Sequence, residues 1–260
     1  MLKELKIDDL NVMIYPDRLS MGEAAAEMVG SLIARLLNEK AYVNIIFAAA
    51  PSQNEFLSAL IEKEDDFDWE RINAFHMDEY IGLPNDHPAL FSSFLKRQLF
   101  EHLPFHTVNY INGNAADPQA ECERYTDLLI QYPTDIVCMG IGENGHIAFN
   151  DPHVADFDDP LKVKIVDLDL DCRQQQVNDG CFSELNEVPT HAITLTVPSL
   201  MAGKHIYCMV PGKNKAMAVH HTLFNKISEA CPASVLRRHP MAVLFLDEDS
   251  NTLIKYLNLI

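Results

Sequence analysis

The sequence contains no apolar run that approaches the roughly 18 residues needed to cross a membrane. Residues 1–5 also lack the apolar segment of a secretory signal peptide. Cysteine is scarce, because the chain has 6 scattered cysteines and no two of them form a C-x-x-C pair. This pattern indicates a reducing compartment and argues against a disulfide framework or a zinc knuckle. We therefore predict a cytoplasmic protein without a membrane partner.

Basic residues are also few. The chain has 20 Lys+Arg against 38 Asp+Glu, which gives a formal net charge of -18. Nucleic acids and anionic membranes bind basic surfaces, so neither is expected as a main partner. An anionic small molecule would have to be held by a few local cations.

Linkers, low-complexity tracts and internal repeats are absent from the sequence, while 48% of its residues are hydrophobic. A chain of this composition builds a substantial core and is not disordered. Because no segment suggests a boundary, we predict that residues 1–260 form a single domain.

Apolar runs of strand length alternate with segments of helical periodicity. Strands are expected at residues 11–16, 42–49, 72–77, 108–111, 135–140, 161–168, 192–197, 205–210 and 241–246. Helices are expected at residues 20–38, 54–64, 91–102, 120–132 and 213–225. This alternation predicts an α/β fold with a mostly parallel sheet covered by helices on both faces. The polar, Gln-rich residues 169–187 are expected to form either a mobile helical flap or a solvated surface helix.

The loop after the strand at residues 135–140 is the first candidate for chemistry. It has glycines at three of six positions, which are Gly140, Gly142 and Gly145. Glycines allow the backbone to approach a ligand closely, and in α/β sheets ligands bind at the carboxyl ends of strands. His146, flanked by Asn144 and Asp151, is suited to acid-base chemistry near neutral pH. The alternative is a tight turn with a structural histidine.

Three other junctions between a strand and a helix contain polar residues. Residues 48–54 contain small residues followed by Ser52 at the expected start of a helix. This segment is either an anion-binding turn or an ordinary N-cap. Asp78 and Glu79 follow the strand at residues 72–77, either as a functional carboxylate pair or as two solvated acids. Lysines at residues 213 and 215 follow a glycine turn and either bind an anion or are solvated.

In order and context, these segments resemble the glucosamine-6-phosphate deaminase/isomerase family. The strongest similarities are FHMDEYIGLP at residues 75–84, GIGENGHIAFN at residues 140–150 and GKNKA at residues 212–216. The resemblance extends over almost the whole chain. It implies a single Rossmann-like domain and a homo-oligomer. It also implies conversion of glucosamine 6-phosphate or galactosamine 6-phosphate to a ketose 6-phosphate and ammonia, without a metal or other cofactor.

The resemblance also assigns roles to residues. It implies that Asp78 moves a proton between C2 and C1 of the sugar and that His146 assists opening of the pyranose ring. Asn144 and Asp151 are expected to orient that histidine. The residues expected to contact the substrate or its phosphate are Ala50, Ser52, Gln53, Gly142 and Lys215.

The chain departs from the family pattern at several positions. Asp151 stands where a glutamate is usual, which shortens the side chain by about 1.5 Å. Residues 50–53 replace a Gly-Gly-Thr-Pro turn, and the arginine expected before Phe182 is absent. Residues 178–180 stand in its place, where Asp179 would repel a phosphate. Arg173, Arg237 and Arg238 are candidates to replace that arginine.

Three alternatives fit the same residues. One is a 6-phosphogluconolactonase, although that branch usually has a different acidic motif at residues 77–80. A second is an isomerase that acts on a different sugar. The third is a catalytically weak paralogue that binds a sugar phosphate, which the altered turn at residues 50–53 would favour.

Overall fold

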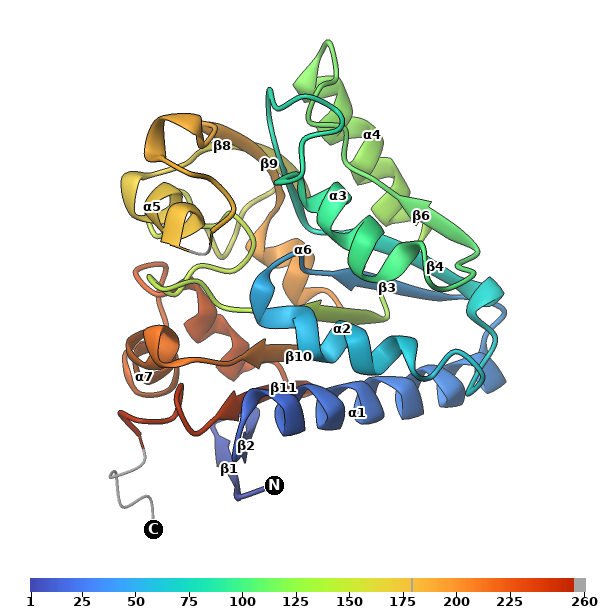
Figure 1. Ribbon diagram of the computed structural model, residues 1–260, viewed down its shortest axis with the longest axis vertical. Helices are drawn as coiled ribbons and strands as arrows, with labels where there is room; N and C mark the ends of the chain where they lie inside the picture. Colours follow the sequence, from blue (N-terminus) through green and yellow to red (C-terminus); the bar gives the residue numbers. More distant parts are fainter. Residues whose placement is uncertain (179, 255–260) are drawn as a thin grey trace.

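A computed structural model describes residues 1–178 and 180–254. The strands are β1 Lys3–Ile7, β2 Leu10–Tyr15, β3 Val43–Phe47, β4 Ile72–His76, β5 Asp78–Tyr80, β6 Thr107–Asn109, β7 Ile136–Met139, β8 Val163–Asp167, β9 His191–Leu195, β10 His205–Val210 and β11 Ala242–Asp247. The α-helices are α1 Arg18–Glu39, α2 Asn54–Ile61, α3 Phe91–Leu95, α4 Pro118–Gln131, α5 Leu170–Asn178, α6 Val197–Met201 and α7 Ala216–Phe224 (Figure 1).

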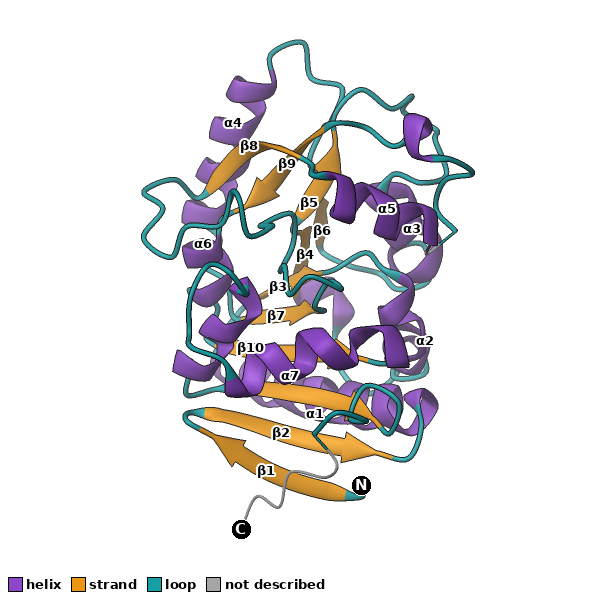
Figure 2. Cartoon of the chain, turned by 90° about the vertical axis from the view of Figure 1, so that its left-hand side faces the viewer, coloured by secondary structure: helices purple, strands orange, loops and turns teal. Residues whose placement is uncertain are grey.

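The main sheet has eight strands in the order β1-β2-β11-β10-β7-β3-β4-β6. Strand β1 is antiparallel to β2, and all the other neighbouring pairs are parallel. Figure 2 shows these strands stacked from β1 towards β6, with helices on both sides. The prediction of a mostly parallel sheet between two helical layers is confirmed.

Each face of the sheet carries its own core. Alternate residues of a strand point to opposite faces, so Ile45 packs under the first helices of the chain while Ile46 faces the other way. Helices α1, α2 and α3 cover one face, and α4, α6 and α7 cover the other. Strand β3 is buried along its whole length, as expected for a parallel strand covered on both sides.

The connections of the sheet reverse direction between β3 and β7. From β3 the chain proceeds outward through β4 to β6, then returns to β7 and proceeds the opposite way through β10 and β11. Such a reversal opens a crevice outside the carboxyl ends of the two strands, where α/β proteins bind ligands. The loops after β3 and β7 therefore flank the expected binding position.

A second sheet, which the sequence did not predict, contains β5, β9 and β8 in antiparallel order. We expected residues 161–168 and 192–197 as strands, but they do not join the parallel sheet. Strand β5 was missed because its three residues, Asp-Glu-Tyr, carry two carboxylates and show no apolar pattern. Strand β1 was also missed, because its sequence is largely charged and exposed.

The polar segment at residues 169–187 begins with helix α5, whose Gln175 and Gln176 are buried. The interpretation of this segment as a solvated surface helix was therefore wrong. The helix expected at residues 91–102 starts as α3 and continues as a π-helical segment, Lys96–Phe100. Among the described residues, no helix combines the length and apolar character that crossing a membrane requires.

Candidate active site

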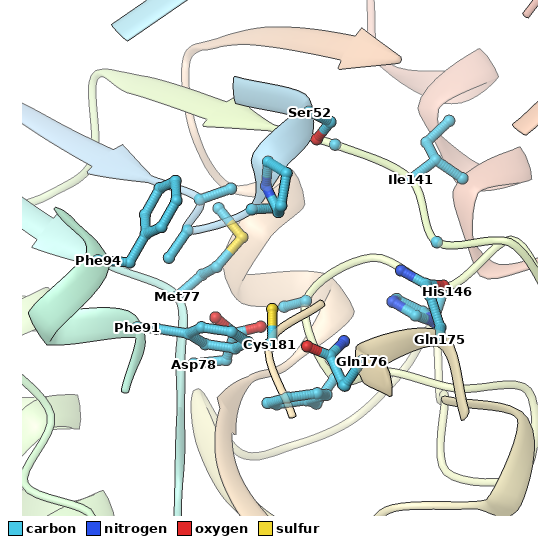
Figure 3. A pocket seen from close by; sticks show the side chains of 18 of the residues that line it. Ser52, Met77, Asp78, Phe91, Phe94, Ile141, His146, Gln175, Gln176 and Cys181 are labelled. Carbon is cyan, nitrogen blue, oxygen red and sulfur yellow. The ribbon is translucent and has the colours of Figure 1, made fainter. Parts of the chain in front are cut away.

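A pocket of about 460 Å³ lies at the carboxyl edge of the main sheet. Its walls include the loops that follow β3, β4, β7 and β10, which are adjacent strands of the sheet. Figure 3 shows Ser52, Asp78 and His146 around this pocket, each from a different segment of the chain. All four junctions that the sequence marked as candidates therefore meet at one position.

The turn after β3 contributes Ala50 and Ser52 to the pocket wall. A short 3-10 turn, Pro51–Gln53, leads directly into α2, so backbone N–H groups lie at the start of a helix. Gln53 is buried behind the turn, where its side-chain amide donates to Ser52 Oγ at 3.0 Å and to the Met209 carbonyl at 3.3 Å. The structure thus places Ser52 at the pocket and Gln53 as its support.

Asp78 lines the pocket although it is almost completely buried, with 7% of its surface exposed. Burial, with a smaller effect from the neighbouring Glu79, raises the pKa of Asp78 well above its ordinary value. A carboxyl group in this state is a stronger base than an exposed one once it has lost its proton. The position and the pKa both suit a group that accepts a proton from a bound molecule.

Glu79 has a different environment from its neighbour. Its carboxylate accepts backbone hydrogen bonds from Tyr80 at 3.0 Å, Phe91 at 3.0 Å and Ser92 at 2.9 Å. These donors include the start of α3, so Glu79 holds the N-terminus of that helix against β5. The two carboxylates of the motif therefore have different environments: Asp78 lines the pocket, whereas Glu79 binds the N-terminus of α3.

His76 fixes the backbone next to Asp78. Its Nε2 accepts from the Ile111 N–H at 2.8 Å, so Nδ1 carries the proton and donates to the Asp78 carbonyl at 2.9 Å. Complete burial lowers the pKa of His76 to about 4. This neutral histidine therefore sets the position from which the Asp78 side chain enters the pocket.

His146 belongs to a hydrogen-bonded network behind the pocket wall. Its Nδ1 lies 2.8 Å from Asn144 Oδ1 and 3.0 Å from Asp151 Oδ1. Asn144 also accepts from the His146 backbone N–H at 3.0 Å and donates through Nδ2 to Asp151 at 2.8 Å, which fixes the orientation of its amide. Because both partners of Nδ1 are oxygen acceptors, Nδ1 carries the proton and Nε2 is the acceptor nitrogen of the ring.

Asp151 is fully buried beneath His146. Burial acts to raise the pKa of Asp151, but hydrogen bonds and charge from His146, then hydrogen bonds from Asn144 and Cys172, outweigh it and lower the pKa. The group is therefore ionised at neutral pH and stabilises a positive charge on the imidazole ring. Asn144 and Asp151 orient His146 from behind the pocket and do not line it.

Gly142 makes room for the histidine ring. A Cβ atom at this position would lie 2.1 Å from His146 Cε1 and 2.3 Å from Nδ1. The Gly142 N–H also donates to the His146 carbonyl at 2.9 Å, which closes the loop. Any side chain at Gly142 would therefore displace His146, whereas the expected contact of Gly142 with the substrate stays a prediction.

The charged side chains on the pocket wall, among the described residues, are Asp78 and three cations: Arg18, Arg97 and Lys215. Lys215 is 6% exposed and lies in the 3-10 turn Lys213–Lys215 after β10. The pocket is therefore locally cationic in a protein whose overall charge is strongly negative. Local cations of this kind attract an anionic ligand against the field of the whole molecule.

Arg18 and Arg97 were not among the sequence candidates. Arg18, at the start of α1, donates to the Pro51 carbonyl at 2.9 Å and to both carboxylate oxygens of Glu55 at 2.6 and 2.8 Å. Its place beside the turn after β3 depends on the packing of α1 against α2, which no local motif encodes. Arg97 donates to the Pro88 carbonyl at 3.0 Å, on the α3 side of the pocket.

The arginines proposed as substitutes lie elsewhere, so that interpretation was wrong. Arg173 donates to the carbonyls of Leu185 and Val188, and Arg237 pairs with Asp8. Arg238 stacks over the Phe157 ring. Each is held by local contacts that the sequence alone does not reveal.

Of residues 178–180, Gly180 lines the pocket with a φ of +77°. Asp179, which we expected to repel a phosphate, lies outside the described residues.

Helix α5 contributes two pocket residues that the sequence did not identify, Gln175 and Gln176. The Gln175 side-chain oxygen accepts from the Glu143 N–H at 2.9 Å, and Asn214 donates to the Glu143 carboxylate at 2.7 Å. These contacts join α5, the histidine loop and the lysine turn. The Gln-rich composition of the segment was the available signal, but it did not show which face was buried.

The pocket wall beside Asp78 is apolar. Phe91 and Phe149 stack with ring centroids 5.4 Å apart, and both rings contact Tyr80 of β5. Phe91 and Phe149 line the pocket, whereas Tyr80 is fully buried. These rings exclude water from the side of the pocket where Asp78 lies, which accounts for the burial of its carboxyl group.

With this geometry established, comparison with known proteins identifies the family. The family model described as glucosamine-6-phosphate isomerases/6-phosphogluconolactonase matches residues 16–245. A protein named glucosamine-6-phosphate deaminase from Bacillus thuringiensis (strain Al Hakam) is 39% identical over 191 residues, which cover 74% of this chain and 71% of that protein. A protein of the same name from Bacillus anthracis (strain A0248) has the same identity and coverage.

Solved structures agree with this assignment. A structure described as a monomeric glucosamine-6-phosphate deaminase superposes with a TM-score of 0.86 at 30% identity, covering 93% of this chain and 99% of that one. The 6-phosphogluconolactonase from Thermotoga maritima has a TM-score of 0.75 at 20% identity, with 91% and 99% coverage, and supports the fold alone. The chain belongs to the glucosamine-6-phosphate isomerase/6-phosphogluconolactonase family, as its motifs indicated.

Proposed function

We propose that the protein is a hexosamine-6-phosphate deaminase/isomerase and that glucosamine 6-phosphate is its first candidate substrate. The observation that carries this proposal is the placement of a buried carboxyl group, Asp78, and an oriented histidine, His146, on one cationic pocket. The named relatives at 39% identity support the deaminase over the lactonase within the family. Galactosamine 6-phosphate, which differs in the configuration of one hydroxyl group, is the second candidate.

In the proposed reaction, His146 opens the pyranose ring. Its Nε2 takes the proton of the anomeric hydroxyl and returns a proton to the ring oxygen as the C1–O5 bond breaks. Asp151 stabilises the imidazolium formed in between, and Asn144 holds the ring in position. The product of this step is an open-chain aldehyde with the amine still on C2.

Asp78 then transfers a proton from C2 to C1. Its carboxylate removes the C2 proton while O1 takes a proton from the C2 ammonium group, which gives a neutral enolamine. The acid so formed then donates its proton to C1 and leaves an iminium at C2. The C2 iminium reacts with water, and the C2–N bond breaks to release ammonia and the ketose 6-phosphate. The raised pKa of Asp78 favours both directions of this transfer, since the group alternates between base and acid.

The phosphate is proposed to bind between the Ser52 turn and Lys215. Backbone N–H groups at the start of α2 and the Ser52 hydroxyl supply donors, and the Lys215 ammonium supplies charge. Arg18 lies beside the same turn and contributes positive potential, although Glu55 offsets part of it. These cations would replace the charge of the arginine in the family pattern, where this chain has residues 178–180.

The test is turnover of a matched set of substrates by the purified protein, with ammonia and ketose 6-phosphate measured separately. We expect both products in equal amounts from glucosamine 6-phosphate and none from unphosphorylated glucosamine. Rapid hydrolysis of 6-phosphogluconolactone without deamination would replace this proposal with the lactonase. Binding of glucosamine 6-phosphate without turnover would identify a sugar-phosphate-binding paralogue.

A further inference from the structure

A group of three potential metal ligands lies directly behind the pocket wall. The side chains of His146, Asp151 and Cys172 are all buried, and one ligand atom from each lies within 4.8 Å of the others. Cys172 is on α5, and the other two residues belong to the loop after β7. The proposed reaction uses His146 and Asp151 but gives no role to the thiol.

The carboxylate of Asp151 has unused capacity at this position. Its Oδ1 contacts His146 and Asn144, whereas Oδ2 is buried and has no hydrogen-bond partner among the described residues. An enclosed, unsatisfied carboxylate oxygen costs free energy, and a cation would satisfy it. The Cys172 thiol is already close enough to Asp151 to affect its pKa, and the unpartnered Oδ2 is a second observation that points to a ligand.

The donor set selects the metal. An imidazole nitrogen, a carboxylate oxygen and a thiolate sulfur together suit zinc, whereas magnesium and calcium prefer oxygen ligands. In a tetrahedral zinc site the ligand atoms lie roughly 3.3 to 3.7 Å apart, given ordinary zinc–ligand bond lengths. The three ligand atoms lie within 4.8 Å of one another, so side-chain rotations would have to bring them closer by about 1 Å at most.

We propose that His146, Asp151 and Cys172 form an inhibitory zinc site behind the pocket wall. On binding, Nδ1 of His146 becomes a ligand and its proton moves to Nε2, while Cys172 loses its proton to solvent. Zinc keeps its charge, since no electron is transferred. The thiolate is the form of cysteine that binds a metal, so binding of zinc releases this proton.

Zinc in this position would stop ring opening, and this consequence rests on the proposed function. The metal would occupy Nδ1, replace the Asn144–His146 hydrogen bond and leave Nε2 protonated. The histidine could then no longer accept a proton from the substrate. Metal binding itself does not depend on which sugar the enzyme uses, so the two proposals can fail separately.

The experiment is titration of the purified chain with cobalt(II) as a spectroscopic substitute for zinc. Ligation by Cys172 is expected to produce a thiolate-to-cobalt charge-transfer band that zinc abolishes by displacement. The Cys172→Ser variant is expected to lack the band, and Asp151→Asn to weaken cobalt binding at least tenfold. Cys181→Ser is the matched control, because Cys181 follows the same helix but lies outside the ligand group, and it should keep the band.

Folding of each variant is checked by its thermal unfolding transition without metal. A cobalt band of unchanged intensity in folded Cys172→Ser would overturn the proposal, as would the absence of any thiolate band in the wild-type protein. If the wild-type protein deaminates a hexosamine phosphate, zinc should also inhibit it and Cys172→Ser should be at least tenfold less sensitive. If the protein binds zinc through Cys172 but deaminates no hexosamine phosphate, the zinc site stands and only the proposed function is contradicted.

Discussion

Asp78 is a single residue whose burial in the pocket destabilises the folded protein when its carboxyl group ionises. A buried carboxylate without a neighbouring cation destabilises the folded state when it ionises. The aromatic rings that keep water from Asp78 also raise its pKa, so the same packing that makes it a stronger base makes it costly to ionise.

We therefore predict that Asp78→Asn stabilises the folded protein at neutral pH by about 1 to 3 kcal/mol. Because the folded-state pKa of Asp78 is raised, the folded state binds more protons, and its stability falls as pH rises above the ordinary pKa. Urea unfolding at several pH values should show the two proteins converging towards pH 4 and diverging above it. Equal stability at all pH values would mean that the carboxyl group is not buried in solution.

Gly142 provides a second test at this scale. Gly142→Ala places a methyl group within 2.3 Å of the His146 ring and must displace it. We expect kcat for hexosamine-phosphate deamination to fall about a hundredfold while the protein still folds. In a His146→Ala background the same change should have little further effect, because the displaced ring is absent. A full hundredfold loss in that background would show that Gly142 acts independently of His146.

Strand β4 and the β5 strand that follows it show how an element positions a side chain. His76 bonds to the Asp78 carbonyl on one side and to the Ile111 N–H on the other, which links β4 to the start of β5 and to the segment after β6. Tyr125 of α4 adds a hydrogen bond to the His76 carbonyl at 2.8 Å. The direction of the Asp78 side chain is therefore set by contacts outside its own motif.

This arrangement predicts an acid-sensitive component of stability. Burial lowers the pKa of His76 from 6.5 to about 4, which corresponds to about 3 kcal/mol. The unfolded state binds the proton first, so this stability is present above pH 6.5 and is lost as pH falls towards 4. His76→Gln should be less stable at pH 7 but lose less stability on acidification. His102→Gln, at an exposed position, is the control. If the free energy of unfolding of His76→Gln changed with pH as steeply as that of the wild-type protein, the prediction would be contradicted.

The sequence predicted those elements whose local pattern is strong. Strand β3 is apolar except for Asn44 and α1 has helical periodicity, so both were found with small errors at their ends. Strand β5 was missed because its formation depends on pairing with β9, more than a hundred residues later. Tertiary contacts of this kind override or replace local propensity.

The candidate site was predictable to a similar degree. Asp78 and His146 stand in recognisable motifs at strand ends, and their meeting follows from strand order. The structural role of Glu79 and the pocket position of Arg18 were not predictable. Both depend on how helices pack against the sheet, through α3 and through the contact of α1 with α2.

At the scale of the whole molecule, a cationic pocket lies in a strongly acidic protein. We expect Lys215→Met to raise KM for the sugar phosphate about 10- to 100-fold, the loss of one charged hydrogen bond. Lys213→Met removes the same charge from an exposed position in the same turn and is the matched control. Comparable KM values for the two variants would show that only the overall field matters, and would place the phosphate away from Lys215.

The assembly and domain organisation stay predictions. We expect a homo-oligomer from the family resemblance, although one structural relative is described as monomeric. Light scattering during size-exclusion chromatography measures this directly, against a chain mass of 29.3 kDa.

The most direct test of the central claim is the rate of ammonia release from glucosamine 6-phosphate by the wild-type protein and by Asp78→Asn. Asparagine keeps the shape of the side chain but cannot accept the C2 proton. We predict turnover by the wild-type protein and a loss of about 10²- to 10⁴-fold in kcat for the folded variant. Deamination at the wild-type rate by Asp78→Asn, or none by the wild-type protein, would contradict the assignment.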